Sequence, residues 1–244
     1  MTFQPFRILH ADRPSRWLVT CDHATNAVPP AIGALGIAPE DMNRHIAYDP
    51  GAAGLTEALA TKLDAPAILS GFSRLVIDPN RGEDDPTLIM RLYDGTIIPA
   101  NRHVDAAETH ARLESLYRPY HAAYAELAAK HADRVICAVH SFTPCLRGRS
   151  PRPWQVGVLY SHLDPRLALP LIARLQASGI CTGDNEPYLG HLEGDAIARH
   201  ALKHGRPNVL IELRNDLIAD REGQALWAAR LAPILQETLA QSGL

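Results

Sequence analysis

The chain has 244 residues, of which 46% are hydrophobic and 21% charged, so it can bury a sizeable core and is not globally disordered. A net charge of −3 argues against nucleic-acid binding, which needs a clustered basic surface. The N-terminus lacks the basic-then-apolar order of a signal peptide, no apolar run is long enough for a membrane span, and the 4 cysteines form no C-x-x-C pair. We therefore expect a reduced, cytoplasmic protein with no membrane partner.

Apolar segments typical of buried strands alternate along the chain with segments of helical periodicity. Strands are predicted over residues 17–21, 65–70, 73–81, 134–140, 154–160 and 208–212. Helices are predicted over 50–63, 105–131, 165–178, 195–204 and 222–242, and loops over 82–103, 144–153 and 181–190. Asp49 is the expected N-cap of the first helix, and Pro119 should kink or break the second.

This alternation predicts an α/β fold with a mixed, mostly parallel sheet. No repeat, low-complexity tract or linker interrupts the chain, so we expect a single domain over residues 1–244.

Three of the predicted strands run directly into side chains that can bind metal or carry protons: His23, His140 and Glu212. In open α/β sheets, ligands bind outside the carboxyl ends of the strands. Two imidazole ligands and a carboxylate that can take a proton from water are what a zinc hydrolase needs. Each residue also has a structural interpretation, since either histidine could be a packing residue and Glu212 could pair with an arginine.

A catalytic zinc site needs a third protein ligand. The candidates are Asp22, Asn26, His45 and Asp49. Asp22 adjoins His23, so their side chains should diverge, and the Asn26 amide is a poor zinc ligand. We favour Asp49, with His45 as an alternative ligand or a substrate contact.

Arginines near the same edge of the sheet predict an anionic substrate. The Asn80-Arg81 pair suits a carboxylate clamp, because a guanidinium binds a carboxylate through two hydrogen bonds and the amide adds a donor. The alternative is an ordinary turn at residues 78–80. Arg74 and Arg214 are further cations, and the set suggests an acyl amino acid.

Six ordered segments together resemble the N-formylglutamate amidohydrolase family in its broader branch. They are residues 21–26, 45–52, 73–81, 140–144, 183–188 and 209–216. The resemblance implies a three-layer α/β/α fold like that of zinc-dependent exopeptidases.

The resemblance also implies roles for individual residues. Asn80 and Arg81 are similar to the pair that holds the substrate carboxylate, and His140-Ser141 to a zinc histidine and the serine after it. Glu212 with Arg214 is similar to the segment that carries the general base, and Tyr188 to a substrate-contacting tyrosine. The chain departs from the exopeptidase pattern at Asn26, where a glutamate ligand would stand.

The sequence thus leads to a zinc-dependent amidohydrolase hypothesis. His23, His140 and Asp49 hold one zinc ion, Glu212 is the base, and Arg74 helps to stabilise the oxyanion. Asn80, Arg81, Arg214, Ser141, Tyr188 and His45 are the expected substrate-binding residues. The expected substrate is a small anionic N-acyl amino acid, N-formylglutamate above all, as in histidine degradation. Alternatives are a related amidase or peptidase and a non-catalytic binding domain; a monomer or small homo-oligomer is expected.

Overall fold

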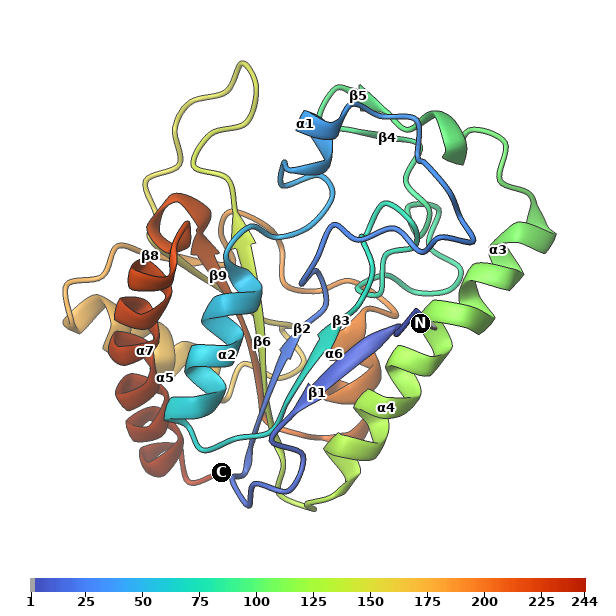
Figure 1. Ribbon diagram of the computed structural model, residues 1–244. Helices are drawn as coiled ribbons and strands as arrows, with labels where there is room; N and C mark the ends of the chain where they lie inside the picture. Colours follow the sequence, from blue (N-terminus) through green and yellow to red (C-terminus); the bar gives the residue numbers. More distant parts are fainter. Residues whose placement is uncertain (1–2) are drawn as a thin grey trace.

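A seven-stranded sheet forms the centre of the computed structural model, which describes residues 3–244 (Figure 1). Across the sheet the strands are β1 (Phe6–Leu9), β3 (Ala67–Ser70), β2 (Trp17–Cys21), β6 (Val135–Phe142), β9 (Asn208–Arg214), β7 (Val156–Leu159) and β8 (Thr182–Asp184). β3, β2, β6 and β9 are parallel. β1 is antiparallel to β3, and β7 is antiparallel to β9 but parallel to β8. The predicted mixed, mostly parallel sheet is confirmed.

Helices cover both faces of this sheet, as the three-layer expectation requires (Figure 1). α2 (Ala52–Lys62), α5 (Ala168–Ala177) and α7 (Arg221–Ser242) lie on one face, and α3 (Ala106–Arg112), α4 (Arg118–Ala129) and α6 (Ala196–His200) on the other. Successive strand residues point to opposite faces, so Val19 packs in the apolar cluster of the first layer and Leu18 in that of the second.

The segment 73–81 is not a strand, so that prediction is wrong. Val76 N donates to Ser73 O in a turn, and the Ser73 hydroxyl donates to Ala47 O. Leu75, Val76 and Ile77 are fully buried all the same, packed in the second apolar cluster. The apolar run therefore reports burial correctly, but the backbone bonds to loops instead of to a neighbouring strand.

Two of the predicted loops contain short elements of secondary structure. The loop 82–103 contains the hairpin β4 (Leu92–Tyr93) and β5 (Thr96–Ile97) and the 3-10 turn η1 (Pro99–Asn101). The loop 181–190 contains β8, and the sequence analysis missed the edge strand β1. The remaining short elements are α1 (Pro39–Met42), η3 (Leu202–His204) and η4 (Asn215–Ile218).

The long helix predicted over 105–131 is interrupted as expected near Pro119. A π-helical turn, η2 (Leu113–Tyr117), separates α3 from α4, and Pro119 stands in the first turn of α4. Proline has no backbone N–H to donate to the preceding turn, and the π-helical turn lies directly before it.

The N-cap of α2 is Gly51 rather than Asp49, which corrects the predicted capping role. Gly51 has φ 81°, and a Cβ added to it would lie 2.2 Å from the Ile218 carbonyl oxygen. Glycine is required by both the backbone conformation and the space. The Asp49 carboxylate makes no cap hydrogen bond and is left for other partners.

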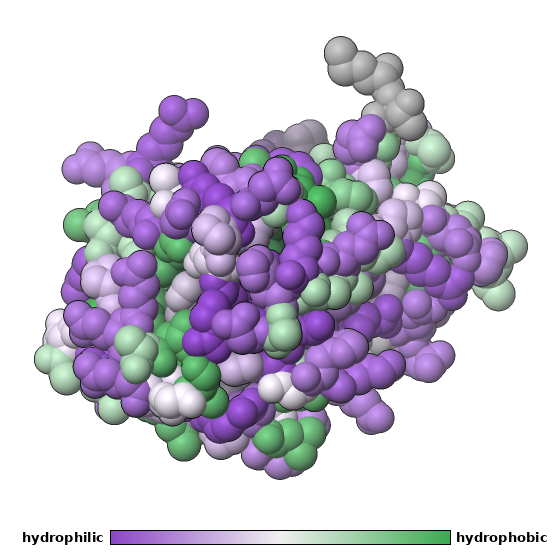
Figure 2. All heavy atoms as spheres, turned by 90° about the horizontal axis from the view of Figure 1, so that it is seen from below, coloured by the Kyte–Doolittle hydropathy of each residue, from purple (hydrophilic) through white to green (hydrophobic). Residues whose placement is uncertain are grey.

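The surface at the amino ends of the parallel strands is mostly hydrophilic, with hydrophobic residues scattered across it (Figure 2). Among residues 3–244, no helix combines the length and the apolar character needed to cross a membrane.

Candidate metal centre and cleft

A cleft opens at the carboxyl ends of β2, β6 and β9, where the sequence placed the site. Polar side chains from segments far apart in the sequence line it, among them His23, Asp49, Arg74, Arg81, His140 and Glu212. The hairpin β4–β5 and the loop after β6 lie at this end of the molecule (Figure 1).

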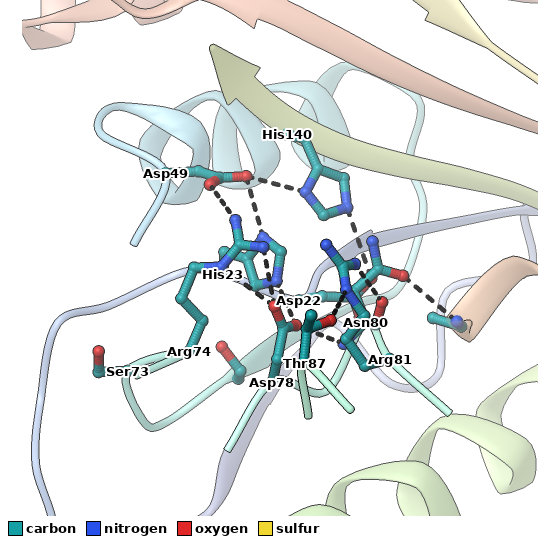
Figure 3. Close-up of polar contacts among 12 residues, drawn as sticks. Asp22, His23, Asp49, Ser73, Arg74, Asp78, Asn80, Arg81, Thr87 and His140 are labelled. Carbon is teal, nitrogen blue, oxygen red and sulfur yellow. Dashed lines mark hydrogen bonds and ion pairs between the residues drawn. The ribbon is translucent and has the colours of Figure 1, made fainter. Parts of the chain in front are cut away.

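His23, Asp49 and His140 form the core of the site. The Asp49 Oδ2 atom lies 3.3 Å from His23 Nδ1 and 2.8 Å from His140 Nδ1. One ligand atom from each residue lies within 4.8 Å of the others, and all three residues are buried (Figure 3). His23 lies just after the end of β2, next to Asp22. His140 lies inside β6, and Asp49 stands just before α2.

A carboxylate stands behind each histidine. His23 Nε2 is 2.7 Å from Asp78 Oδ1, and His140 Nε2 is 3.5 Å from Asp22 Oδ2. The Tyr120 hydroxyl donates to the other oxygen of Asp22 at 2.5 Å. Carboxylates on the outer nitrogen of a histidine fix its tautomer and orientation in metal sites. The Asp78 contact thereby directs His23 Nδ1 towards Asp49, whereas His140 Nε2 and Asp22 Oδ2 are close but have no hydrogen-bond partner among residues 3–244.

The buried charges of the site favour binding of a cation. Burial opposes ionisation of Asp49 and Asp78, but the charges of His23 and Arg74 respectively, together with hydrogen bonds from the histidines, hold the pKa of each carboxyl below its usual value. Burial alone would lower the pKa of His140, yet Asp22 and Asp49 raise it well above its usual value. Two nitrogen donors and one carboxylate, surrounded by further buried anions, suit a divalent metal ion.

Glu212 lies beside this cluster. It is the register partner of His140 on the adjacent strand, and its Oε2 atom is buried without a hydrogen-bond partner among residues 3–244. Burial, and the negative charge of Asp49, raise the pKa of Glu212 to about 7 against the effect of the nearby His140. A carboxyl group with a pKa near neutrality can both accept and return a proton.

Arg74 is held between two of the buried carboxylates. Its Nη2 donates to Asp78 Oδ2 at 2.8 Å, and its Nη1 lies 3.6 Å from Asp49 Oδ1. Asp78 therefore joins the His23 imidazole to the Arg74 guanidinium. From the sequence, Asp78 is expected only in a turn, although its position at the end of the buried run 75–77 is a signal that could mark it as a site residue.

Asn80 and Arg81 both line the cleft. Asn80 N donates to Asp78 Oδ1 at 2.9 Å, and its side-chain oxygen accepts from Ala196 N at 3.3 Å, which leaves the amide NH₂ as the free end. Arg81 donates to Thr87 Oγ1 and to Asn80 O, and forms no ion pair within residues 3–244.

Of the other predicted site residues, some line the cleft and some do not. His45, Ser141 and Tyr188 line the cleft, although the Ser141 hydroxyl is occupied by the Pro50 carbonyl. Arg214 does not line it and pairs with Asp216 at 2.8 Å, so the structure does not bring it to the site. The Asn26 amide donates to Met42 O instead of joining the metal cluster.

Comparison with known proteins agrees with this geometry. A family model described as N-formylglutamate amidohydrolase matches residues 15–219. The chain belongs to this family. Amidohydrolases hydrolyse amides, so membership of this family makes the chain a hydrolase. No functionally curated protein matches the chain in sequence.

Several solved structures are similar to the chain, one of them an N-formylglutamate amidohydrolase. A gene product from Agrobacterium tumefaciens is 32% identical with a TM-score of 0.94, over 99% of this chain and 97% of that one. The N-formylglutamate amidohydrolase from Ralstonia eutropha JMP134 is 25% identical with a TM-score of 0.75, over 98% and 99%. A bacteriophage poly-gamma-glutamate hydrolase, 12% identical with a TM-score of 0.51 over 99% and 91%, shares the fold.

Proposed function

We propose that the protein is a zinc-dependent amidohydrolase that cleaves the amide of a small anionic N-acyl amino acid. The observation that carries the proposal is the buried His23-Asp49-His140 cluster beside Glu212, in a cleft that also contains Arg81. Membership of the N-formylglutamate amidohydrolase family makes N-formylglutamate the first substrate to test, with formate and glutamate as products.

His23, Asp49 and His140 are the proposed metal ligands. The two Nδ1 atoms and Asp49 Oδ2 already converge, Asp78 contacts the outer nitrogen of His23, and Asp22 lies 3.5 Å from that of His140. Zinc is proposed because two imidazoles, one carboxylate and an open position are a recurrent catalytic zinc set. A zinc ion bound there would act as a Lewis acid towards water and the amide carbonyl.

Side chains of the cleft would transfer the proton and bind the substrate. Glu212 would take a proton from the attacking water and return it to the leaving nitrogen. Arg81 and the Asn80 amide would bind the substrate carboxylate, and Arg74 would add positive charge on the oxyanion side. Tyr188 and His45 line the cleft and would contact the substrate.

The test is release of formate from N-formylglutamate by protein supplied with zinc, and its loss after chelation. Arg81→Ala should chiefly raise KM, because it removes a contact made in the bound substrate as well as in the transition state. Arg166→Ala is the matched control, since Arg166 pairs with Asp164 away from the cleft. An unchanged KM in Arg81→Ala would remove Arg81 from the carboxylate site.

Two alternatives remain testable in the same experiment: another N-acyl or peptidyl substrate, and a binding domain without catalysis. A panel of N-formyl, N-acetyl and N-succinyl amino acids separates the first. Absence of turnover with every panel member by zinc-loaded protein would favour the second.

We also propose that the protein acts in the cytoplasm as a monomer or small homo-oligomer.

A further inference from the structure

One wall of the cleft is apolar and has no part in the proposed chemistry. Leu210 lies two residues before Glu212 on β9, so both side chains point to the same face of the sheet. Leu159 on β7 is its register partner. Both leucines line the cleft and are nearly buried, with 4% of Leu159 and 8% of Leu210 exposed. The floor next to the proposed base is therefore a pair of leucines.

The loop after β8 adds further apolar side chains at the mouth. Tyr188, Leu189 and Leu192 line the cleft and are exposed by 39%, 79% and 39%. Large apolar groups gathered on a surface commonly mark a binding site. Their position here, around a cleft with an apolar floor, extends the apolar wall towards solvent.

This loop is fixed to the end of β7. Asn185 Oδ1 accepts from both Tyr160 N at 3.0 Å and Gly190 N at 3.1 Å. A Cβ added to Gly190 would lie 2.1 Å from Tyr160 N, so the two backbones touch. His191 Nδ1 is 2.8 Å from Ser161 Oγ. The backbone that carries the three apolar side chains is thus fixed beside the cleft.

The cleft offers few cations for the anionic groups of a substrate. Of its two lining arginines, Arg74 is committed to Asp78 and Asp49, and only Arg81 forms no ion pair within residues 3–244. Arg152 lies over the Tyr188 ring and donates to its hydroxyl and to Thr143 O, without lining the cleft. Asp195 and Glu212 add carboxyl groups to the lining.

A substrate with one carboxylate matches this charge distribution, and a second carboxylate would face leucines and acidic groups. Burying a carboxylate without a partner is strongly unfavourable.

We infer that the cleft selects N-acyl amino acids that have a single carboxylate and an apolar substituent of about the size of leucine or phenylalanine, in preference to N-formylglutamate. The inference rests on the proposed amidohydrolase function. Arg81 binds the carboxylate, and Leu159, Leu210 and Leu189 contact the apolar group. The reaction is unchanged: water adds to the acyl carbon, the C–N bond breaks, and a carboxylic acid and an amino acid are released.

The apolar substituent can be the amino-acid side chain or the acyl chain, and two probes distinguish them. N-formyl-leucine has an apolar side chain and the smallest acyl group, whereas N-hexanoylglycine has an apolar acyl group and no side chain. N-formylglutamate is the reference. Binding of each is measured by calorimetry to zinc-loaded Glu212→Gln protein, and turnover is measured with zinc-loaded wild type.

We expect one of the two apolar probes to bind at least about tenfold more tightly than N-formylglutamate, the scale on which hydrophobic pockets discriminate. Leu189→Ser should reduce that preference severalfold. Leu163→Ser is the control and should leave the preference unchanged, because Leu163 is also an exposed loop leucine, at 66%, but lies outside the cleft.

Equal or tighter binding of N-formylglutamate, no binding of any probe, or a preference insensitive to Leu189→Ser would overturn the inference. Absence of wild-type turnover with all three probes would instead contradict the proposed function, while the binding measurements would still decide the substrate preference.

Discussion

Replacing Asp78 by asparagine removes one negative charge from the centre of the site while keeping the shape of the side chain. Asp78 is completely buried. It accepts hydrogen bonds from Arg74 Nε and Nη2 at 3.1 and 2.8 Å and from Asn80 N at 2.9 Å, and it faces His23 Nε2 at 2.7 Å. The variant therefore leaves a buried guanidinium short of its counter-ion and a histidine without its anionic partner.

The size of the effect follows from these contacts. Breaking a buried ion pair by removing one partner costs about 3–5 kcal/mol. A 244-residue chain unfolds with an entropy of about 0.5 kcal/mol/K, so the melting temperature should fall by roughly 6–10 °C. Loss of a carboxylate behind a ligating histidine weakens metal binding about 10–100-fold.

The assay combines urea unfolding of the metal-free protein with zinc titration against a competing chelator. Asp164→Asn is the matched control: Asp164 is also mostly buried and pairs with an arginine, but Arg166 is half-exposed and the pair lies outside the cleft. The control should lose about 1 kcal/mol, as expected for an exposed pair, with unchanged zinc affinity. Asp78→Asn protein that binds zinc as tightly as wild type would refute the role given to Asp78.

Three further predictions concern the base, a buried histidine pair and the loop over the cleft. Glu212→Gln should keep zinc and substrate binding but lose about 10²–10⁴-fold in kcat, measured by formate release; near-normal turnover would exclude Glu212 as the base. His121 and His200 lie 2.8 Å apart and are buried, and burial lowers their pKa values to about 4 and about 3. In the unfolded chain both histidines protonate near pH 6.5, so each should destabilise the fold by about 2 kcal/mol on going from pH 7 to pH 5. Glu212, whose pKa is raised to about 7, adds stability over the same range, so the test compares the change in urea midpoint of wild type with that of His200→Gln; an equal change in the two proteins would contradict the prediction. Gly190→Ala should raise KM severalfold without changing zinc content, because the added Cβ would displace the loop from Tyr160; an unchanged KM would show that the loop does not contact substrate.

The fold, and the strand ends that carry the proposed metal ligands, were accessible from sequence because they depend on strong local patterns. Buried parallel strands are continuous apolar runs, and the residues that end them must meet at one edge of the sheet. This logic placed His23, His140 and Glu212 around one cleft. Asp49 was harder, because an aspartate before a proline and a helix also suits an N-cap, and only the Gly51 conformation shows that it does not cap.

What the sequence did not reveal depends on contacts between segments that no local pattern encodes. Asp78 faces His23 only after the loop 73–81 packs against the strand ends, and Asp22 faces His140 because β2 and β6 are neighbours in the sheet. That loop has the apolar character of a strand, but its backbone forms hydrogen bonds with other loops and not with a neighbouring strand. Arg214 was assigned to the site from its spacing to Glu212, but its guanidinium turns to Asp216 beyond the end of β9.

The most direct test of the account is the zinc content of wild-type, Asp49→Ala and Glu212→Gln proteins, measured by elemental analysis after dialysis against limiting free zinc. The account predicts about one zinc per chain for wild type and Glu212→Gln and almost none for Asp49→Ala, because Asp49 Oδ2 lies between the two histidine nitrogens. Full zinc retention by Asp49→Ala, or a wild-type protein that binds none, would contradict it.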